Sequence, residues 1–407
     1  MTKRHWSRRN FIKTAGTACA SSVLVPGLAM GAVPDHRDRA WAAAPGQVPK
    51  RPFGRSGIAV SMLSLGGMFD IPNNQLMLQQ ALRLGVTYWD TANSYGYGSS
   101  EEGIGQFFAK YPEARQSVFL VTKSGREDPD DLAEHLNLSL KRLKTDTVDL
   151  FFMHALSSTR PLTDDVRRWA ERAKADGKIR LFGFSTHRNM QSCLQEAAKM
   201  EWIDAIMMTY NFRLMHDPEM QAAVAACQEA GIGLTAMKTQ GGGQVETGSD
   251  EALALGGRFV ERGFTPHQAK LKAVWDNPAI ASICSQMPNM TILMANTAAA
   301  LDRTHLTSGD HRQLAHFAEL TRAGYCTGCG DVCESALAEC PPVADVMRYL
   351  MYSRNYGDHR RARARFERLS VSNRRALAEA DYAEAERRCP QGLPIGRLMR
   401  EALAELG

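Results

Sequence analysis

The sequence predicts a parallel (β/α)8 TIM barrel followed by a small, mainly helical C-terminal domain that contains cysteines. Short strand-like runs alternate with helical patterns eight times, which is typical of a parallel sheet. Several of the runs end in reactive side chains, and in such a barrel the carboxyl ends of the strands converge on the face where chemistry takes place. The chain of 407 residues exceeds the ~250 residues of a bare barrel, so additional segments at its ends are expected.

The spacing of apolar residues defines the predicted elements. Strands are expected at residues 60–65, 87–90, 118–122, 148–153, 181–184, 205–209, 233–237 and 281–285. Helices are expected between them at 76–84, 102–111, 131–143, 165–175, 190–200, 219–230 and 266–275, with an eighth at 292–301. Further helices are expected at 311–322, 343–353, 373–388 and 395–406. These elements divide the chain into an N-terminal segment at 1–33, a linker at 34–50, a barrel at 51–310 and a C-terminal domain at 311–407.

Reactive side chains stand at the ends of three successive predicted strands. The second strand ends in Asp90, and Tyr95 follows in the next loop. The third and fourth strands lead into Lys123 and His154. Each residue alone has an ordinary structural explanation, as a cap, a loop aromatic, a surface lysine or a core histidine. Four such groups on one face of a barrel instead indicate proton transfer.

The motifs around these residues resemble those of the aldo/keto reductase family. They read Trp-Asp-Thr-Ala-x-x-Tyr-Gly at 89–96, Val-Thr-Lys-Ser at 121–124 and Phe-Phe-Met-His at 151–154. The resemblance extends from about Pro52 to Asn296. It implies an oxidoreductase that interconverts small carbonyls and alcohols by hydride transfer from a nicotinamide cofactor.

The resemblance assigns a catalytic role to each of the four residues, which we call the tetrad. Tyr95 is the general acid that protonates the developing alkoxide, although a phenol with a pKa of about 10 is a poor donor at neutral pH. A neighbouring ammonium favours the phenolate, so Lys123 is expected to lower that pKa while Asp90 keeps Lys123 charged and oriented. His154 is expected to hydrogen-bond the substrate oxygen and to polarise the carbonyl.

The resemblance also implies NADP(H) or NAD(H) as the cofactor. Tyr210 matches the ring that stacks on the nicotinamide, Ser185 the serine that hydrogen-bonds its carboxamide, and Asn296 an asparagine on the adenine side. The cation with which the family grips the 2′-phosphate of NADP has no counterpart before Asp302. The choice between the two nucleotides therefore stays open, and Lys238 is the nearest remaining residue that could donate a hydrogen bond to a phosphate.

Five of the nine cysteines lie in the last quarter of the chain. Cys326, Cys329 and Cys333, together with Cys389 ahead of a proline, resemble the ferredoxin-like tail of the iron–sulfur aldo/keto reductases. The resemblance implies one 4Fe-4S cluster on these four cysteines and, with it, an electron-transfer partner. Cys340 is a rival fourth ligand, and a zinc site, disulfides or a tail without metal remain open alternatives.

The first 33 residues carry the entire net charge of +5. Residues 7–13, Ser-Arg-Arg-Asn-Phe-Ile-Lys, resemble the twin-arginine export motif, and a weakly apolar stretch to about residue 30 follows. That stretch falls short of the ~20 apolar residues of a membrane span. The segment predicts a twin-arginine (Tat) signal and a periplasmic, exported protein, with a basic tail or a membrane anchor as alternatives. The neutral remainder gives no reason to expect nucleic acid as a partner.

Two further features are interpreted as structural. Cys193, Cys227 and Cys284 lie in apolar runs and are expected to be small buried residues. The basic run at 360–368 is interpreted as a solvated helix face. The competing hypothesis for the whole chain is a non-catalytic barrel that serves as a binding scaffold, with a structural metal or disulfide site in its tail. Retention of the tetrad argues against this hypothesis, and the missing nucleotide contacts argue for it.

Overall fold

The barrel strands follow one another in chain order around a closed ring. In the computed structural model, which describes residues 46–242 and 265–407, all eight pair in parallel with their neighbours. They are β3 (Leu63–Gly66), β4 (Tyr88–Asp90), β5 (Phe119–Ser124), β6 (Val148–Leu156), β7 (Ile179–Thr186), β8 (Ala205–Thr209), β9 (Gly233–Met237) and β10 (Ile280–Gln286). Pairing of β10 with β3, which sets Ile283 opposite Leu63, closes the ring. The predicted fold class is therefore confirmed.

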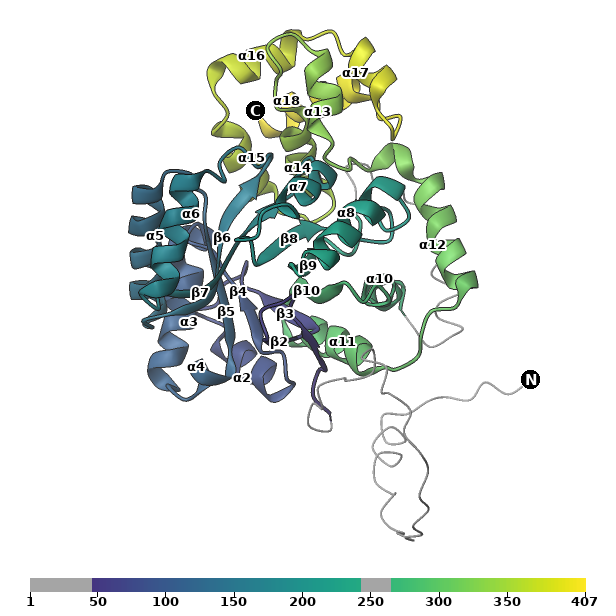
Figure 1. The fold of residues 1–407 in the computed structure, drawn as a ribbon. Helices are drawn as coiled ribbons and strands as arrows, with labels where there is room; N and C mark the ends of the chain where they lie inside the picture. The colour runs from purple at the N-terminus through teal and green to yellow at the C-terminus, as the bar shows by residue number, and fades with distance from the viewer. Residues whose placement is uncertain (1–45, 243–264) are drawn as a thin grey trace, which may run out of the picture. The chain divides into compact units, whose positions relative to one another are not determined.

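Helices cover the outside of the barrel (Figure 1). They are α2 (Gln75–Arg83), α3 (Ser99–Lys110), α4 (Ala114–Ser117), α5 (Pro129–Leu143), α6 (Asp164–Ala175), α7 (Met190–Ala197), α8 (Pro218–Glu229), α10 (Pro266–Trp275) and α11 (Met290–Leu301). Capping side chains fix several of their starts. The Thr163 side chain accepts a hydrogen bond from the N–H of Val166 at the start of α6, and Asp128 accepts one from the N–H of Asp130 at the start of α5.

Side chains alternate between two cores along each strand, as the two-residue period of a strand requires. On β4 and β8, Tyr88 and Met207 belong to the cluster inside the barrel, whereas Trp89 and Met208 belong to the cluster beneath the helices. Inward positions near the strand ends can therefore contribute side chains to a site at the open carboxyl end of the barrel.

An antiparallel hairpin of β1 (Lys50–Pro52) and β2 (Ala59–Ser61) precedes the barrel. It differs from the single strand predicted at 60–65, because β2 pairs with β1 and only the following β3 joins the ring. Phe53, just after β1, is fully buried and packs edge-on against Phe119, the first residue of β5, with 5.5 Å between ring centroids. The hairpin thus fills the amino-terminal end of the barrel and leaves the carboxyl end open.

The C-terminal domain consists of short helices, and all but the first surround a core of their own, whereas the first packs against Phe212, Ala269 and Ala273. They are α12 (Ser308–Leu320), α13 (Gly330–Cys333), α14 (Val343–Arg354), α15 (His359–Glu367), α16 (Val371–Glu379), α17 (Ala383–Arg388) and α18 (Ile395–Leu406). The helix predicted at 373–388 is split into α16 and α17 because the backbone of Ala380 is extended. Figure 1 shows α13 to α18 gathered together, with α12 leading to them from the barrel.

The N-terminal segment at 1–33 and most of the predicted linker lie outside the described residues. Near the end of that linker, Val48 is buried and its N–H donates to the carbonyl of Leu84 at 2.8 Å.

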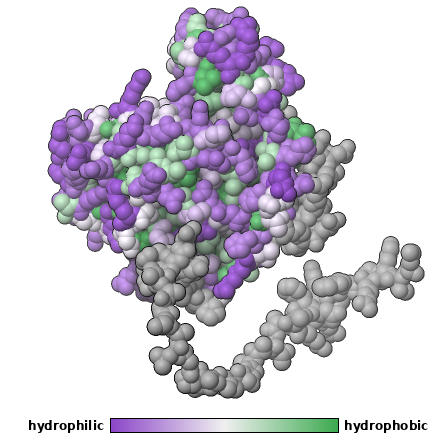
Figure 2. Space-filling model, turned by 45° about the vertical axis from the view of Figure 1, so that its right-hand side comes forward, coloured by the Kyte–Doolittle hydropathy of each residue, from purple (hydrophilic) through white to green (hydrophobic). Residues whose placement is uncertain are grey.

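In residues 46–242 and 265–407, no helix combines the length and the apolar character needed to cross a membrane. The face shown in Figure 2 is predominantly hydrophilic.

Candidate active site

Asp90 and Lys123 form a buried ion pair at the carboxyl end of the barrel. Asp90 ends β4, Lys123 lies on the neighbouring β5, and both are almost fully buried. The Lys123 ammonium lies 2.5 Å from a carboxylate oxygen of Asp90 and donates to the carbonyl of Thr91 at 2.8 Å. Burial would lower the pKa of Lys123, but attraction to Asp90 and Tyr95 outweighs burial and raises the pKa. Lys123 therefore stays charged at neutral pH.

Tyr95 and His154 complete the tetrad beside this pair. Tyr95 begins a short 3-10 turn (Tyr95–Gly98), and its hydroxyl lies 3.5 Å from the Lys123 Nζ. His154 on β6 faces Tyr95, with 5.7 Å between the ring centroids and 71° between the ring planes. The structure thus brings the four predicted residues together from three strands and one loop.

Burial dominates the titration of Tyr95 and His154. It raises the pKa of Tyr95 to about 12, and the positive charge of Lys123 offsets only part of the rise. The expectation that Lys123 lowers this pKa below its usual value is therefore corrected. Burial, followed by the charges of Lys123 and Arg365, holds the pKa of His154 well below 6.5. At neutral pH, Tyr95 is a protonated phenol and His154 a neutral imidazole, and both can hydrogen-bond a carbonyl oxygen.

The tetrad opens into a cavity of about 620 Å³, which we call the tetrad cavity. Two of the four residues predicted to bind the nucleotide, Ser185 at the end of β7 and Lys238 just after β9, also line it. The Ser185 hydroxyl accepts a hydrogen bond from the N–H of Ala155 at 2.9 Å. The Lys238 backbone is left-handed, with φ of 56°, and its carbonyl accepts a hydrogen bond from the Asn211 side chain at 3.1 Å.

The other two residues predicted to bind the nucleotide, Tyr210 and Asn296, are not among the described residues that line the tetrad cavity. Tyr210 has the same strand parity as Met208, so it lies in the core beneath the helices, where its hydroxyl accepts a hydrogen bond from Asn277 at 2.9 Å. That Tyr210 stacks on the nicotinamide stays a prediction. Asn296 on α11 donates to the hydroxyl of Ser285, which does line the cavity, at 3.0 Å.

Cys284 lines the tetrad cavity, although its apolar surroundings in the sequence predict a buried structural residue. It lies on β10, and burial raises the pKa of its thiol, which therefore stays protonated. Cys193 and Cys227 are buried, as expected.

The C-terminal domain supplies a second wall of the tetrad cavity. Helices α14 and α15 and the residue that follows α15 contribute Arg348, Tyr349, Tyr352, Arg361, Arg365 and Arg368. The interpretation of the basic run as a solvated face is thereby corrected. Its three lining arginines recur at i, i+4 and i+7 and so share one side of the helix; Arg361 and Arg365 are half-buried, whereas Arg360, Arg363 and Arg368 are exposed. This spacing is the signal in the sequence that groups the three.

Tyr352 lies between cations where the two walls meet. The Lys238 Nζ lies 3.4 Å from its hydroxyl and 4.6 Å from its ring centroid, and the Arg361 guanidinium lies 4.2 Å from the same centroid. Burial would raise the pKa of Tyr352, but attraction of the phenolate to Lys238, Arg348 and Arg361 brings it down to about 7. The sequence does not indicate this group, because its partners come from both the barrel and the C-terminal domain.

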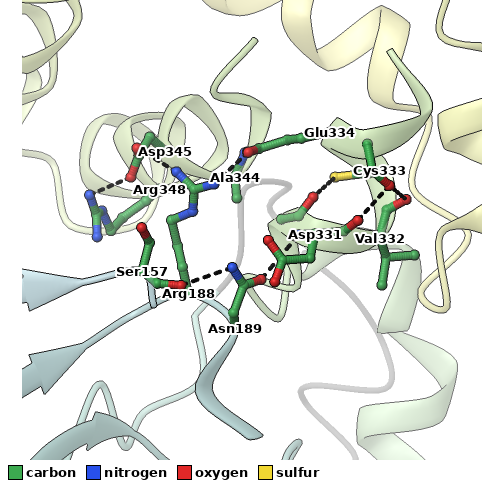
Figure 3. A network of polar contacts seen from close by, with 12 residues as sticks. Ser157, Arg188, Asn189, Asp331, Val332, Cys333, Glu334, Ala344, Asp345 and Arg348 are labelled. Carbon is green, nitrogen blue, oxygen red and sulfur yellow. Dashed lines mark hydrogen bonds and ion pairs between the residues drawn. The ribbon is translucent and has the colours of Figure 1, made fainter. Parts of the chain in front are cut away.

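Arg188 ties the cysteine-rich segment to the barrel (Figure 3). It follows β7, and its guanidinium binds the carboxylate of Asp345 at 2.9 Å and that of Glu334. The adjacent Asn189 accepts a hydrogen bond from the N–H of Asp331 at 3.1 Å. Charge pairs and backbone contacts thus hold α13 and α14 against the loop after β7.

Gly328 allows this close approach. It has a φ of 83°, and a Cβ at this position would overlap the carbonyl oxygen of His187 in the barrel. Its own carbonyl accepts a hydrogen bond from the N–H of Asn189 at 2.9 Å. The turn between Cys326 and Cys329 is therefore docked against the barrel wall.

The four predicted metal ligands, Cys326, Cys329, Cys333 and Cys389, line one small cavity in the C-terminal domain. Its other walls are mainly apolar and include Val343, Met347, Leu393 and Ile395. Cys340 is exposed and is not among the described residues that line this cavity. Within the described ranges, no three or more His, Cys, Asp or Glu side chains are grouped so that they could hold a single metal ion.

Known proteins share the barrel. A fungal aldo-keto reductase from Schizosaccharomyces pombe, yakc, whose name specifies NADP(+), is 33% identical over 172 residues, which cover 39% of this chain and 49% of that protein. The chain matches between 49% and 66% of the length of the first curated relatives.

Two solved structures share the fold. The aldo-keto reductase AKR11C1 from Bacillus halodurans is 24% identical, with a TM-score of 0.55 over 66% of this chain and 95% of that chain. An aldo/keto reductase from Klebsiella pneumoniae, solved with NADP and acetate, is 23% identical, with the same TM-score and coverage.

The family model of the aldo/keto reductases matches residues 62–291. This range contains all eight barrel strands and the whole tetrad. The match covers more than half of the chain and agrees with the motifs that end β4, β5 and β6. The chain belongs to the aldo/keto reductase family.

Proposed function

We propose that the chain is an oxidoreductase that interconverts small carbonyls and alcohols with a nicotinamide cofactor. The observation that carries the proposal is the buried 2.5 Å ion pair of Lys123 with Asp90, which lies beside the Tyr95 hydroxyl in the tetrad cavity. Two charges placed out of water are costly, and such pairs with strongly shifted pKa values cluster at functional sites.

In this proposal each tetrad residue acts on the carbonyl oxygen or on the group that protonates it. Tyr95 gives its proton to the developing alkoxide, and Lys123 stabilises the phenolate that remains. Asp90 keeps the ammonium charged and oriented, and neutral His154 hydrogen-bonds the carbonyl oxygen. When bound, the nicotinamide supplies the hydride, and Ser185 and Lys238 are the predicted cofactor residues that line the cavity and would hold it.

NADPH is expected to bind little more tightly than NADH. A 2′-phosphate gains affinity from charge-assisted hydrogen bonds, and residues 286–301 contain no Arg or Lys. Fluorescence titration of both nucleotides measures the difference and tests the proposed function directly. A preference for NADPH above about 100-fold, or ~2.7 kcal/mol, would mean that a cation elsewhere grips the phosphate. Failure to bind either nucleotide would favour the non-catalytic scaffold.

We propose further that the C-terminal domain holds one 4Fe-4S cluster on Cys326, Cys329, Cys333 and Cys389. The small apolar cavity that all four residues line supports this assignment. Zinc would gather four ligands around one ion at about 2.0–2.3 Å, whereas a cluster binds its thiolates on separate irons.

The position of this cavity is consistent with a link between the cluster and the tetrad. Cys326 also lines a second small cavity together with Lys238 and Arg348. Both of those residues line the tetrad cavity as well. A cluster at the cysteines would therefore lie close to the proposed reaction site, and an electron-transfer partner would complete its function.

We propose that the protein is exported to the periplasm by the twin-arginine pathway. The proposal rests on residues 7–13, which lie outside the described residues. Replacing Arg8 and Arg9 by lysine is expected to leave the protein in the cytoplasm, as measured by immunoblotting of cell fractions. The matched control is Arg4→Lys, which lies outside the motif. Unchanged periplasmic protein in the Arg8→Lys/Arg9→Lys variant would reject this route.

A further inference from the structure

The wall of the tetrad cavity carries far more positive charge than the tetrad uses. The described residues that line it include seven basic side chains: Lys123, Arg126, Lys238, Arg348, Arg361, Arg365 and Arg368. They include one carboxylate, Asp90, which is already paired with Lys123. Six cations therefore face the cavity without a carboxylate partner in its lining.

Four of these arginines come from the C-terminal domain, and among the described residues Arg361 and Arg365 form no ion pair. Arg361 stacks on the ring of Tyr352, and burial together with repulsion by Arg361 lowers the pKa of Arg365. Arg348 binds Asp345 at 2.7 Å through one terminal nitrogen, but its buried Nε has no hydrogen-bond partner in the described part of the chain. A buried donor without a partner and like charges held together are both unfavourable unless a ligand completes them.

We propose that Arg348, Arg361 and Arg365 bind an anionic group, a carboxylate or a phosphate, on the carbonyl substrate while its carbonyl lies at the tetrad. The inference rests on the proposed function, because it positions the anion relative to the reacting oxygen. Guanidinium groups suit both anions, since they donate parallel hydrogen bonds to two oxygens at once. The C-terminal domain thereby selects charged substrates for a barrel whose own lining near Met207 and Met237 is apolar.

The diphosphate of the nucleotide is also an anion that guanidinium groups bind, so it is the alternative ligand for these arginines. The location of the arginines favours the substrate. Arg348, Arg361 and Arg365 line the same cavity as His154, and their charges all lower the pKa of His154, so they act on the end of the cavity where the carbonyl would bind. The charge of Arg361 also acts to lower the pKa of Tyr95.

The test compares a charged aldehyde with a neutral one. Wild type and the double variant Arg361→Gln/Arg365→Gln are assayed with 4-carboxybenzaldehyde and with benzaldehyde. The ratio of kcat/KM for the two aldehydes is expected to fall by about 10- to 100-fold in the double variant, because one or two charge-assisted hydrogen bonds are lost. The matched control is Arg360→Gln, an exposed arginine on the same helix, which should keep the wild-type ratio.

Two further measurements separate the alternatives. NADPH affinity is titrated in each variant. If kcat/KM falls equally for both aldehydes and NADPH binds more weakly, the arginines belong to the nucleotide site and the proposal is overturned. An unchanged ratio in the double variant would also overturn it. Calorimetric titration with benzoate and benzamide measures anion binding without turnover: wild type and Arg360→Gln should prefer benzoate, and the double variant should not. If neither aldehyde is reduced, the proposed function fails, and the benzoate titration still decides the anion site.

Discussion

Replacing Tyr95 by phenylalanine is expected to lower kcat for carbonyl reduction by about 10²–10⁴-fold, the usual contribution of a positioned general acid. The phenol is the only tetrad group in the proposal that gives a proton to the alkoxide. Its ring would remain in place beside His154, so the shape of the tetrad cavity is retained. Nucleotide affinity is therefore expected to stay nearly unchanged. Steady-state kinetics with a neutral aldehyde and fluorescence titration of NADPH measure the two effects separately.

Tyr97 provides a matched control for this substitution. It lies in the same 3-10 turn, two residues beyond Tyr95, but its side chain is 81% exposed. Tyr97→Phe likewise removes a tyrosine hydroxyl from this turn and should leave turnover at the wild-type level. If Tyr95→Phe also keeps wild-type turnover, the phenol is not the acid. Tyr352, whose pKa is brought to about 7 by the surrounding cations, would then be the next group to test.

The strand pattern of the sequence predicts the barrel well because strand periodicity is a local property. The same period also identifies the inward side chains at the strand ends. Asp90 lies two residues after the inward Tyr88, and Lys123 lies two residues after the inward Val121. Tyr210 fails this test, since it is three residues from the inward Met207. Parity thus accounts for the burial of Tyr210 beneath the helices, but it is no strict rule, because Lys238, two residues after the outward Ala236, lines the tetrad cavity.

The second wall of the site is harder to predict because it depends on how the C-terminal domain packs on the barrel. A run of arginines is normally solvated, and no local pattern says that a barrel mouth lies opposite it. The contacts that set this position join residues far apart in sequence, such as Arg188 with Asp345 and Lys238 with Tyr352. The helical spacing of the lining arginines was visible, but it could not say what their shared side faces.

The pKa of Tyr95 shows a related limit. The sequence correctly suggests that Lys123 lies close by, and proximity alone would lower the pKa of the phenol. The amount of solvent lost by the phenol depends on the packed structure, and here burial is the larger effect and raises the pKa to about 12. Residue types thus predict which groups interact, whereas the balance between desolvation and charge follows only from their packing.

Replacing Cys389 by serine is expected to remove the 4Fe-4S cluster, whereas Cys340→Ser should keep it. Cys389 directly follows α17 and lines the same small cavity as Cys326, Cys329 and Cys333, while Cys340 is exposed. A compact triplet of cysteines supplies three irons with thiolates, so the fourth thiolate must reach the cluster from elsewhere in the chain. The structure brings only Cys389 to that position among the described residues. Without it, the cluster lacks one of its four protein ligands.

The metal and its fourth ligand are identified by measuring iron, zinc and acid-labile sulfide per chain, together with the visible absorption spectrum of anaerobically purified protein. Wild type and Cys340→Ser should each contain about four irons, and Cys389→Ser should contain far fewer. Iron retained in Cys389→Ser but lost from Cys340→Ser would reverse the assignment of the fourth ligand. Zinc without acid-labile sulfide in wild type would indicate a structural zinc site in place of the cluster. Because Cys326 belongs to the segment docked on the barrel by Gly328 and Arg188, losing the cluster should also loosen that segment, which hydrogen exchange at residues 326–333 would detect.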